Sequence, residues 1–201
     1  MFHFMNDLAR LLPFREGHFR FESGHHCDKW LDLEALCLRP EPVEQLAAQL
    51  ADRIAPYHVD AVCGPLVEGA FVALMVASRL RVLFTYAERF DEQTNMLYPV
   101  TYRLPGTLRD VVRGKRIAIV NDVTSAGSAV RGAYADLLDC GGTPVVVGTL
   151  ALLGDATRKF AADNKIPLET LGSFPNQIWK PEECPMCARG MQLTEHGQTT
   201  N

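Results

Sequence analysis

Residues 116–130 constrain the fold most, because an apolar run, an acid, a loop of small residues and a helical pattern follow one another directly. Asp122 ends the apolar run, and beyond the loop apolar residues recur at the i, i+3, i+4 and i+7 spacing of one helix face. Gly141 and Gly142 then end the pattern, as glycine often does at helix C-termini. A strand, a loop and a helix N-terminus in this order form an anion site, since free backbone N–H groups converge there.

The residues of this loop suit a phosphorylated sugar. Small side chains let a phosphate approach the backbone, and Ser125 and Ser128 add hydroxyl donors. Asp122, at the carboxyl end of the strand, suits the paired hydroxyls of a ribose. A strand–loop–helix connection without a ligand is the alternative. The coincidence of the acid, Gly127 and the hydroxyls with the structural break favours the binding site.

Composition bounds the class of protein. With 201 residues, 47% of them apolar and 22% charged, we expect one globular domain with a substantial core. The net charge of −4 argues against sequence-independent nucleic-acid binding. No apolar run approaches the ~20 residues of a membrane span, and the start lacks a signal-peptide pattern, so we expect no membrane association and a cytoplasmic location. Cys37, Cys63 and Cys140 are expected to be core thiols in a reducing compartment.

Strand and helix patterns alternate from residue 43 onward, which predicts an α/β fold with a central parallel sheet flanked by helices. Ligands bind such sheets at the carboxyl ends of the strands, where Gly64 and Asn121-Asp122 fall. The expected elements are a short helix at 5–13, a strand at 17–24, an amphipathic helix opened by Pro42, a strand at 60–64, a buried helix at 69–80, and strands at 81–86 and 144–153.

Residues 87–115 have no long apolar period and combine charges with Asn95, Pro99, Pro105 and Gly106. A segment of this length inside a domain is usually a functional lid or a small hairpin, and residues 98–102 could form one arm of it.

The segment after Asp122 resembles the phosphoribosyl pyrophosphate (PRPP) signature of the type I phosphoribosyltransferases. Residues 123–130 fit that pattern of one apolar residue, small or hydroxyl residues, Gly and further small residues, and Asp122 occupies the second of its two acid positions. Asn121 occupies the first, which is a departure, because Asn can bond a hydroxyl but carries no charge.

An N-terminal segment narrows the resemblance. Residues 17–24, followed by Trp30 and Asp32, resemble the N-terminal motif of orotate phosphoribosyltransferases. The family places a basic residue, which touches the pyrophosphate, at the position of His26.

Residues 63–70 match the Gly-Pro-x-x-x-Gly pyrophosphate loop of the family. The family usually has Lys at the position of Glu68, so either this acid turns outward or the loop works through its backbone amides.

The family also carries a hood rich in basic residues, which closes over the reaction. Here no lysine occurs between Lys29 and Lys115, and Arg89 is the cation at the expected position, with Arg103 next. A solvated loop arginine is the alternative interpretation of Arg89.

The resemblance implies a type I phosphoribosyltransferase fold over residues 1–175, with a small hood from about 14–35 and 87–115, and a C-terminal tail over 176–201. It also implies a homodimer, Mg²⁺ bound with PRPP, and Asp122 and Arg89 as catalytic residues. The implied contacts are Thr124, Ser125, Ala126, Gly127, Ser128 and Ala129 for the 5′-phosphate, Asn121 and Asp122 for the ribose, and Pro65, Leu66, Val67, Glu68, Gly69 and His26 for the pyrophosphate.

The tail contains Cys184 and Cys187 with a turn-forming Pro185 between them, which is half of a zinc site or a redox pair. Zn²⁺ binding, free thiols and a disulfide all remain open, and none of the other ligand candidates has diagnostic spacing. Those candidates are His25, His26, Cys27 and His196, whereas His3, His18 and His58 are expected to be surface or hydrogen-bonded residues.

The activity implied is transfer of ribose 5-phosphate from PRPP to a nitrogenous base, with orotate as the leading acceptor and pyrimidine nucleotide synthesis as the setting. One alternative is a non-catalytic protein of the same fold that senses PRPP or a nucleotide, which Asn121, Glu68 and the lysine-free hood would allow. Another is an enzyme for a purine or a different pyrimidine.

Overall fold

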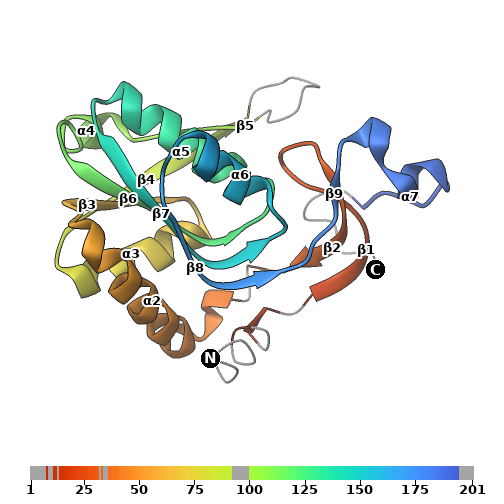
Figure 1. Cartoon of the computed structure of the whole chain (residues 1–201), viewed down its shortest axis with the longest axis horizontal. Helices are drawn as coiled ribbons and strands as arrows, with labels where there is room; N and C mark the ends of the chain where they lie inside the picture. The colour runs from red at the N-terminus through yellow and green to blue at the C-terminus, as the bar shows by residue number, and fades with distance from the viewer. Residues whose placement is uncertain are drawn as a thin grey trace.

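The computed structural model describes residues 8, 11–12, 14–31, 33, 36–91 and 100–194. Its centre is a six-stranded sheet in the order β5-β4-β3-β6-β7-β8, which we call the main sheet (Figure 1). Its strands are β3 (Ala61–Pro65), β4 (Leu83–Asp91), β5 (Val100–Arg103), β6 (Arg116–Thr124), β7 (Thr143–Leu153) and β8 (Leu168–Phe174).

The predicted parallel sheet is confirmed for five strands, and the sixth makes the sheet mixed. β3, β4, β6, β7 and β8 run parallel, whereas β5 pairs antiparallel with β4. The segment expected as a lid or hairpin therefore extends the edge of the main sheet, with the short helix α4 (Gly106–Arg109) after it. Residues 98–99 of the expected arm lie outside the described residues, as does most of the helix expected at 5–13.

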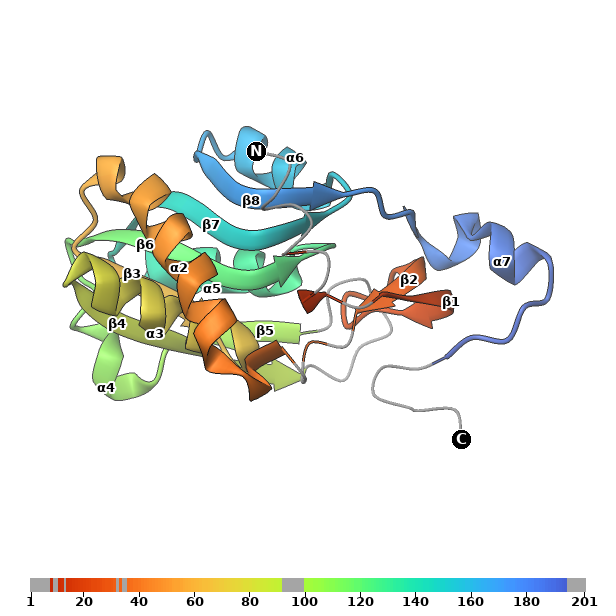
Figure 2. The same cartoon turned by 90° about the horizontal axis from the view of Figure 1, so that it is seen from below.

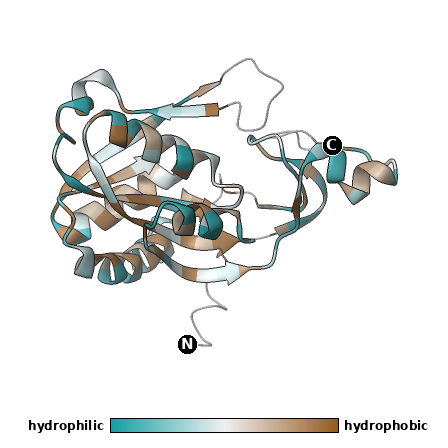
Figure 3. Ribbon diagram, turned by 45° about the horizontal axis from the view of Figure 1, so that its top comes forward, coloured by the Kyte–Doolittle hydropathy of each residue, from teal (hydrophilic) through white to brown (hydrophobic). Residues whose placement is uncertain are grey.

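Helices cover both faces of the main sheet (Figures 1 and 2). α2 (Pro40–Ile54) and α3 (Glu68–Leu80) pack on one face, and α5 (Ser128–Asp139) and α6 (Ala156–Asp163) on the other. Residues 117–120 of β6 alternate between the two cores, because side chains along a strand point to opposite faces. The apolar colour in Figure 3 accordingly runs along the central strands.

The predicted burial is confirmed for α2 but not for α3. The predicted apolar face of α2 is buried throughout, from Val43 to Ile54. The prediction that α3 is buried all round is wrong, since Phe71 and Leu74 are 45% and 50% exposed. Periodicity could not separate the two faces of α3, because both carry apolar residues.

A second, three-stranded sheet stands apart from the main sheet (Figure 2), and we call it the small sheet. It has the order β1-β2-β9, with β1 (Phe14–Arg20), β2 (His26–Leu31) and β9 (Ile178–Trp179) all antiparallel. Of the two segments expected to form the hood, described residues of 14–31 lie in the small sheet, where β9 of the C-terminal tail joins them, whereas β5 of the second segment pairs with β4 in the main sheet. The short helix α7 (Pro185–Ala188) follows β9, and the 3-10 turns are η1 (Leu36–Leu38), η2 (Ala55–Tyr57) and η3 (Pro181–Glu183).

In the part of the chain that the structure describes, no helix is both long and apolar enough to cross a bilayer.

Candidate active site

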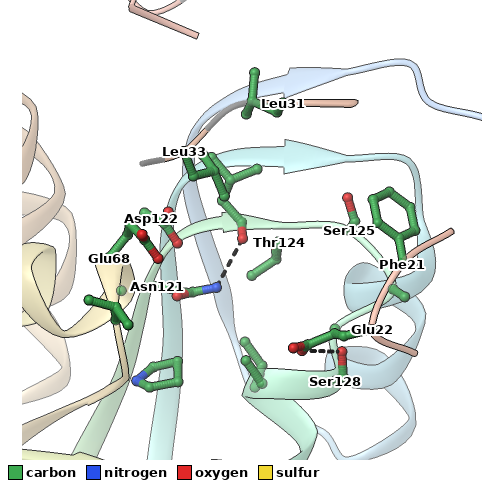
Figure 4. Close-up of a pocket in the computed structure, with 18 of the residues that line it drawn as sticks. Phe21, Glu22, Leu31, Leu33, Glu68, Asn121, Asp122, Thr124, Ser125 and Ser128 are labelled. Atoms are coloured by element: carbon green, nitrogen blue, oxygen red, sulfur yellow. Dashed lines mark hydrogen bonds between the residues drawn. The ribbon is translucent and has the colours of Figure 1, made fainter. Parts of the chain in front are cut away.

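A cavity of about 640 Å³ opens at the carboxyl ends of β3 and β6 (Figure 4), within the size range typical of small-molecule sites. Its lining includes Arg89 and all residues that the sequence assigned to the 5′-phosphate, the ribose and the pyrophosphate, except His26. The small sheet and its β1–β2 turn contribute Trp30, Phe21 and Glu22 to the lining. The predicted meeting of the two loops at the strand ends is therefore what the structure shows.

Residues 124–129 connect β6 to the N-terminus of α5 and form one wall of the cavity. Gly127 precedes the helix with a φ of +81°, a conformation that side chains other than Gly rarely adopt. A Cβ at this position would also lie 2.9 Å from Thr157 Oγ1. The loop thus presents backbone N–H groups with no side chain at its tightest point, which is the geometry of an anion site.

Asp122 lies at the floor of the cavity and is only 3% exposed. Its Oδ2 atom has no hydrogen-bond partner among the described residues. Burial is the main cause that raises the pKa of Asp122 to about 7, with a smaller contribution from the nearby Glu68 carboxylate, against the opposing effect of the Val123 backbone N–H. A buried carboxylate with an unused acceptor suits hydroxyl donors or a cation.

Asn121 connects the two loops of the site. Its Nδ2 donates a 2.9 Å hydrogen bond to the Val123 carbonyl, which fixes the amide orientation. Its Oδ1 approaches Gly69 so closely that a Cβ on that residue would lie 1.9 Å away. Gly69 is therefore required by close approach, a role that the sequence did not indicate.

Glu68 lies at the start of α3, and its side chain lines the cavity beside Asp122 (Figure 4). Of the two possibilities left by the sequence, an outward-turned Glu68 is not what the structure shows. The preceding Leu66–Val67 peptide is cis. Glu68 and Asp122 thus give the site two neighbouring carboxylates, although Asn121 replaces the first acid of the signature.

Sequence reasoning missed Glu22, which joins the small sheet to residues 124–129, called here the phosphate loop after the ligand that the sequence predicts for it. Its Oε1 accepts hydrogen bonds from Ser128 Oγ at 2.8 Å and from Tyr102 OH at 3.1 Å. Arg89 Nε lies 3.6 Å from its Oε2. Glu22 is an ordinary polar position in the β1–β2 turn, and no local signal could reveal contacts with residues as far away in the sequence as Tyr102 and Ser128.

The two arginines considered for the hood have different surroundings. Arg89 lines the cavity, whereas the Arg103 guanidinium stacks on Phe90, 5.6 Å from the ring centre. Among the described residues of the lining, two are cations and four are acids, so the wall carries an excess of negative groups. They are Arg15, Arg89, Glu22, Glu68, Glu88 and Asp122.

The prediction that His26 meets pyrophosphate needs correction, because His26 is outside the cavity lining. It is 5% exposed, and its Nδ1 lies 3.2 Å from Cys187 Sγ. It was also named as a partner of the cysteine pair, and this is where the structure places it. His18, expected to be a surface or hydrogen-bonded residue, belongs to the same group, whereas His25 and Cys27 do not, and His196 lies outside the described residues.

Comparison with known proteins agrees with this geometry. Residues 32–182 match the family described as phosphoribosyl transferase domain. The chain belongs to the type I phosphoribosyltransferase family. An orotate phosphoribosyltransferase of Caldanaerobacter subterraneus is 27% identical over 188 residues, covering 94% of this chain and 92% of the relative.

Solved phosphoribosyltransferase structures share the fold. Adenine phosphoribosyltransferase from Thermoanaerobacter pseudethanolicus superposes with a TM-score of 0.66 at 16% identity, covering 85% of this chain and 99% of that one. Orotate phosphoribosyltransferase from Aeropyrum pernix gives 0.63 at 18% identity, covering 87% and 94%. The predicted family, fold and enzyme class are thus confirmed, and since adenine and orotate enzymes match equally well, the fold does not select the base.

Proposed function

We propose that this phosphoribosyltransferase transfers ribose 5-phosphate from PRPP to orotate, giving the nucleoside 5′-monophosphate and pyrophosphate in pyrimidine nucleotide synthesis. The observation that carries the proposal is the convergence of the 124–129 loop, Asp122 and the 65–69 loop on one cavity. In this proposal the 124–129 loop holds the 5′-phosphate of PRPP, Asp122 holds the ribose, and the 65–69 loop holds the pyrophosphate.

In the proposed reaction, a ring nitrogen of the base gives up its proton to solvent and forms a bond to C1′ of the ribose as the bond from C1′ to the pyrophosphate oxygen breaks. The electron pair of that bond leaves on pyrophosphate. Asp122, when ionised, accepts hydrogen bonds from the ribose hydroxyls and stabilises the positive charge that develops on the ring. Most of the rate enhancement then comes from positioning and electrostatics rather than from a nucleophile on the protein.

Mg²⁺ fits the residues present. The orphaned Oδ2 of buried Asp122 and the adjacent Glu68 carboxylate are oxygen donors of the kind that Mg²⁺ prefers. When bound with PRPP, the ion would neutralise part of the pyrophosphate charge, and Asp122 and Glu68 would hold it. Such a cation matters in this site because the acids of the lining outnumber its cations, so the protein alone offers little positive charge to pyrophosphate.

We propose orotate rather than a purine as the acceptor because relatives that match nearly the whole chain are named orotate phosphoribosyltransferase. Aromatic side chains of Phe21, Trp30 and Tyr102 line the cavity and offer flat surfaces to a base. We further propose a cytoplasmic homodimer, as the family resemblance implies.

The second candidate is a sensor that binds PRPP or a nucleotide without catalysis. Asn121 at the first acid position and the scarcity of cations in the described lining favour it. It shares the binding site with the enzyme and differs only in turnover.

One assay separates the two candidates. The protein is incubated with PRPP, Mg²⁺ and orotate, uracil, adenine or hypoxanthine in turn, and pyrophosphate release is followed, with a Mg²⁺-free reaction as control. Release with orotate alone supports the proposal, and release with a purine alone changes the acceptor. A protein that binds PRPP in calorimetry and releases no pyrophosphate with any base is the sensor.

A further inference from the structure

Four side chains that can ligate a metal meet where the C-terminal tail crosses the small sheet, away from the cavity. One comes from β1, one from the start of β2, and two from α7 and the residue before it. Their ligand atoms all lie within 4.8 Å of one another. We call this group the His/Cys cluster, and its members are His18, His26, Cys184 and Cys187.

The separations within the cluster match those around a tetrahedral zinc ion. With Zn–N bonds of about 2.0 Å and Zn–S bonds of about 2.3 Å, two nitrogens lie about 3.3 Å apart and a nitrogen and a sulfur about 3.5 Å apart. His18 Nε2 lies 3.1 Å from His26 Nδ1 and 3.5 Å from Cys184 Sγ. Cys187 Sγ lies 3.7 Å from His18 Nε2 and 3.2 Å from His26 Nδ1.

The tautomer of His18 shows why hydrogen bonds alone do not explain this arrangement. His18 Nδ1 lies 3.0 Å from the Met191 carbonyl oxygen, which only accepts, so Nδ1 carries the proton in the neutral ring. Nε2 then presents one lone pair to three converging groups, although one lone pair accepts one good hydrogen bond. A cation at the centre accounts for all of them, and metal-binding histidines typically donate their other N–H to a carbonyl in this way.

Burial and donor chemistry identify the kind of site. His18 and Cys184 are each 3% exposed, and Cys187 is exposed, which leaves a path for the metal. Two thiolates and two imidazoles form a closed set of four, as in structural zinc sites, with no position left for a substrate. The cysteines are free thiols rather than a disulfide. We propose that the His/Cys cluster binds one structural Zn²⁺.

A bound metal would stabilise the C-terminal tail, because the described residues 176–194 have little apolar core of their own. β9 pairs with β2 over two residues, and Cys184 and Met186 are the buried apolar side chains among the described residues of the tail. Backbone hydrogen bonds between Thr194 and the His18–Arg20 segment add to the contact. Small units that lack a sufficient core commonly rely on a metal.

The metal also bears on the cavity, through the β1–β2 turn. His18 and His26 lie on either side of this turn, whose tip carries Glu22 and its hydrogen bond to Ser128. Zn²⁺ therefore fixes both ends of the turn that reaches the phosphate loop. The site is separate from the reaction chemistry, so the proposal does not depend on the acceptor or on turnover.

Metal analysis of the full chain, purified without added metal and without a metal-affinity tag, is the primary test. We expect about one zinc per chain, retained through gel filtration. Cys184→Ser and His18→Gln should lose it, whereas Cys37→Ser and His25→Gln, which change the same residue types outside the cluster, should retain it. Less than about 0.2 zinc per chain in the parent, with no uptake when reduced and chelator-treated protein is titrated with Zn²⁺, overturns the proposal. A Cys184–Cys187 disulfide in the freshly purified protein overturns it too.

Two further measurements keep the proposal testable if the variants fold poorly. Co²⁺ added to the chelator-treated parent should give the intense visible bands of a tetrahedral site with thiolate ligands, and a weak octahedral spectrum contradicts the assignment. Trypsin provides an internal control, since Arg189-Gly190 in the tail and Arg113-Gly114 in the α4–β6 turn are both exposed Arg-Gly bonds. Removing zinc should speed cleavage at Arg189 by roughly tenfold and leave Arg113 unchanged, because only the tail loosens. Equal rates with and without zinc contradict the proposed tie.

Discussion

Two apolar cores between helices hold the main sheet, whereas the small sheet combines a few aromatic contacts, such as Phe19 and Phe21 with Trp30, with polar groups and the His/Cys cluster. Central strands such as β6 and β7 are buried on both faces between helices. The small sheet ends in a two-residue strand and a tail with little buried apolar surface. The lesson is that groups on the main sheet are positioned by regular structure, while Glu22 and the His/Cys cluster are positioned by specific long-range contacts.

The largest expected effect comes from breaking the phosphate loop of the main sheet. Gly127→Val should abolish PRPP binding, since a branched side chain disfavours the φ of +81° and enters space 2.9 Å from Thr157 Oγ1. Gly114→Val is the matched control, because Gly114 also has a positive φ, +70°, but open space around it. Calorimetry with PRPP and Mg²⁺ should show binding to the control alone. If the Gly127 variant binds as tightly as the parent, the phosphate lies elsewhere.

The same contrast explains what the sequence could predict. The β6 strand, the buried face of α2 and the 124–129 loop follow from local period and turn chemistry, which one segment carries by itself. The placement of Glu22 against Ser128 and of His26 against Cys187 joins segments more than 100 residues apart. No local pattern encodes such pairings, so the sequence places His26 at the pyrophosphate and gives no indication of Glu22.

The next effect concerns the charge at the floor of the site. Asp122→Asn should lower turnover with PRPP and orotate by roughly 10²-fold or more, as loss of one preorganised electrostatic group typically does. Asp110→Asn, at an acid whose side chain is 91% exposed, is the control and should leave turnover unchanged. Steady-state kinetics checks both variants. A variant at Asp122 with parental turnover would remove it from the mechanism.

A smaller effect is expected where the two sheets meet. Arg89→Ala should lower turnover roughly tenfold, about 1.4 kcal/mol, because Arg89 lines the cavity and neighbours Glu22. Arg103→Ala, in the strand paired with β4, removes a cation that stacks on Phe90 outside the lining and should have little effect. Equal losses of turnover in both variants would mean that turnover depends on the structure of the β4–β5 pair rather than on the charge of Arg89.

The last prediction does not concern turnover and tests the buried carboxyl through the stability of the main sheet without metal or ligand. The folded-state pKa of Asp122, about 7, lies above its ordinary value of 3.8, because burial and then Glu68 disfavour the charged form. Between these values the folded chain holds the proton more tightly than the unfolded chain, so this group makes the free energy of unfolding fall as pH rises. The slope is on the order of 1 kcal/mol per pH unit and disappears above the folded pKa.

Asp122→Asn keeps the shape and removes the titration, so its free energy of unfolding should exceed that of the parent increasingly from about pH 4 to about pH 7. Urea unfolding in the presence of a chelator measures both proteins, with Asp110→Asn as the control that follows the parent. Parallel pH profiles for the parent and Asp122→Asn would show that Asp122 is already ionised in the folded state, and that the main sheet bears no cost for keeping this charge ready for its ligand.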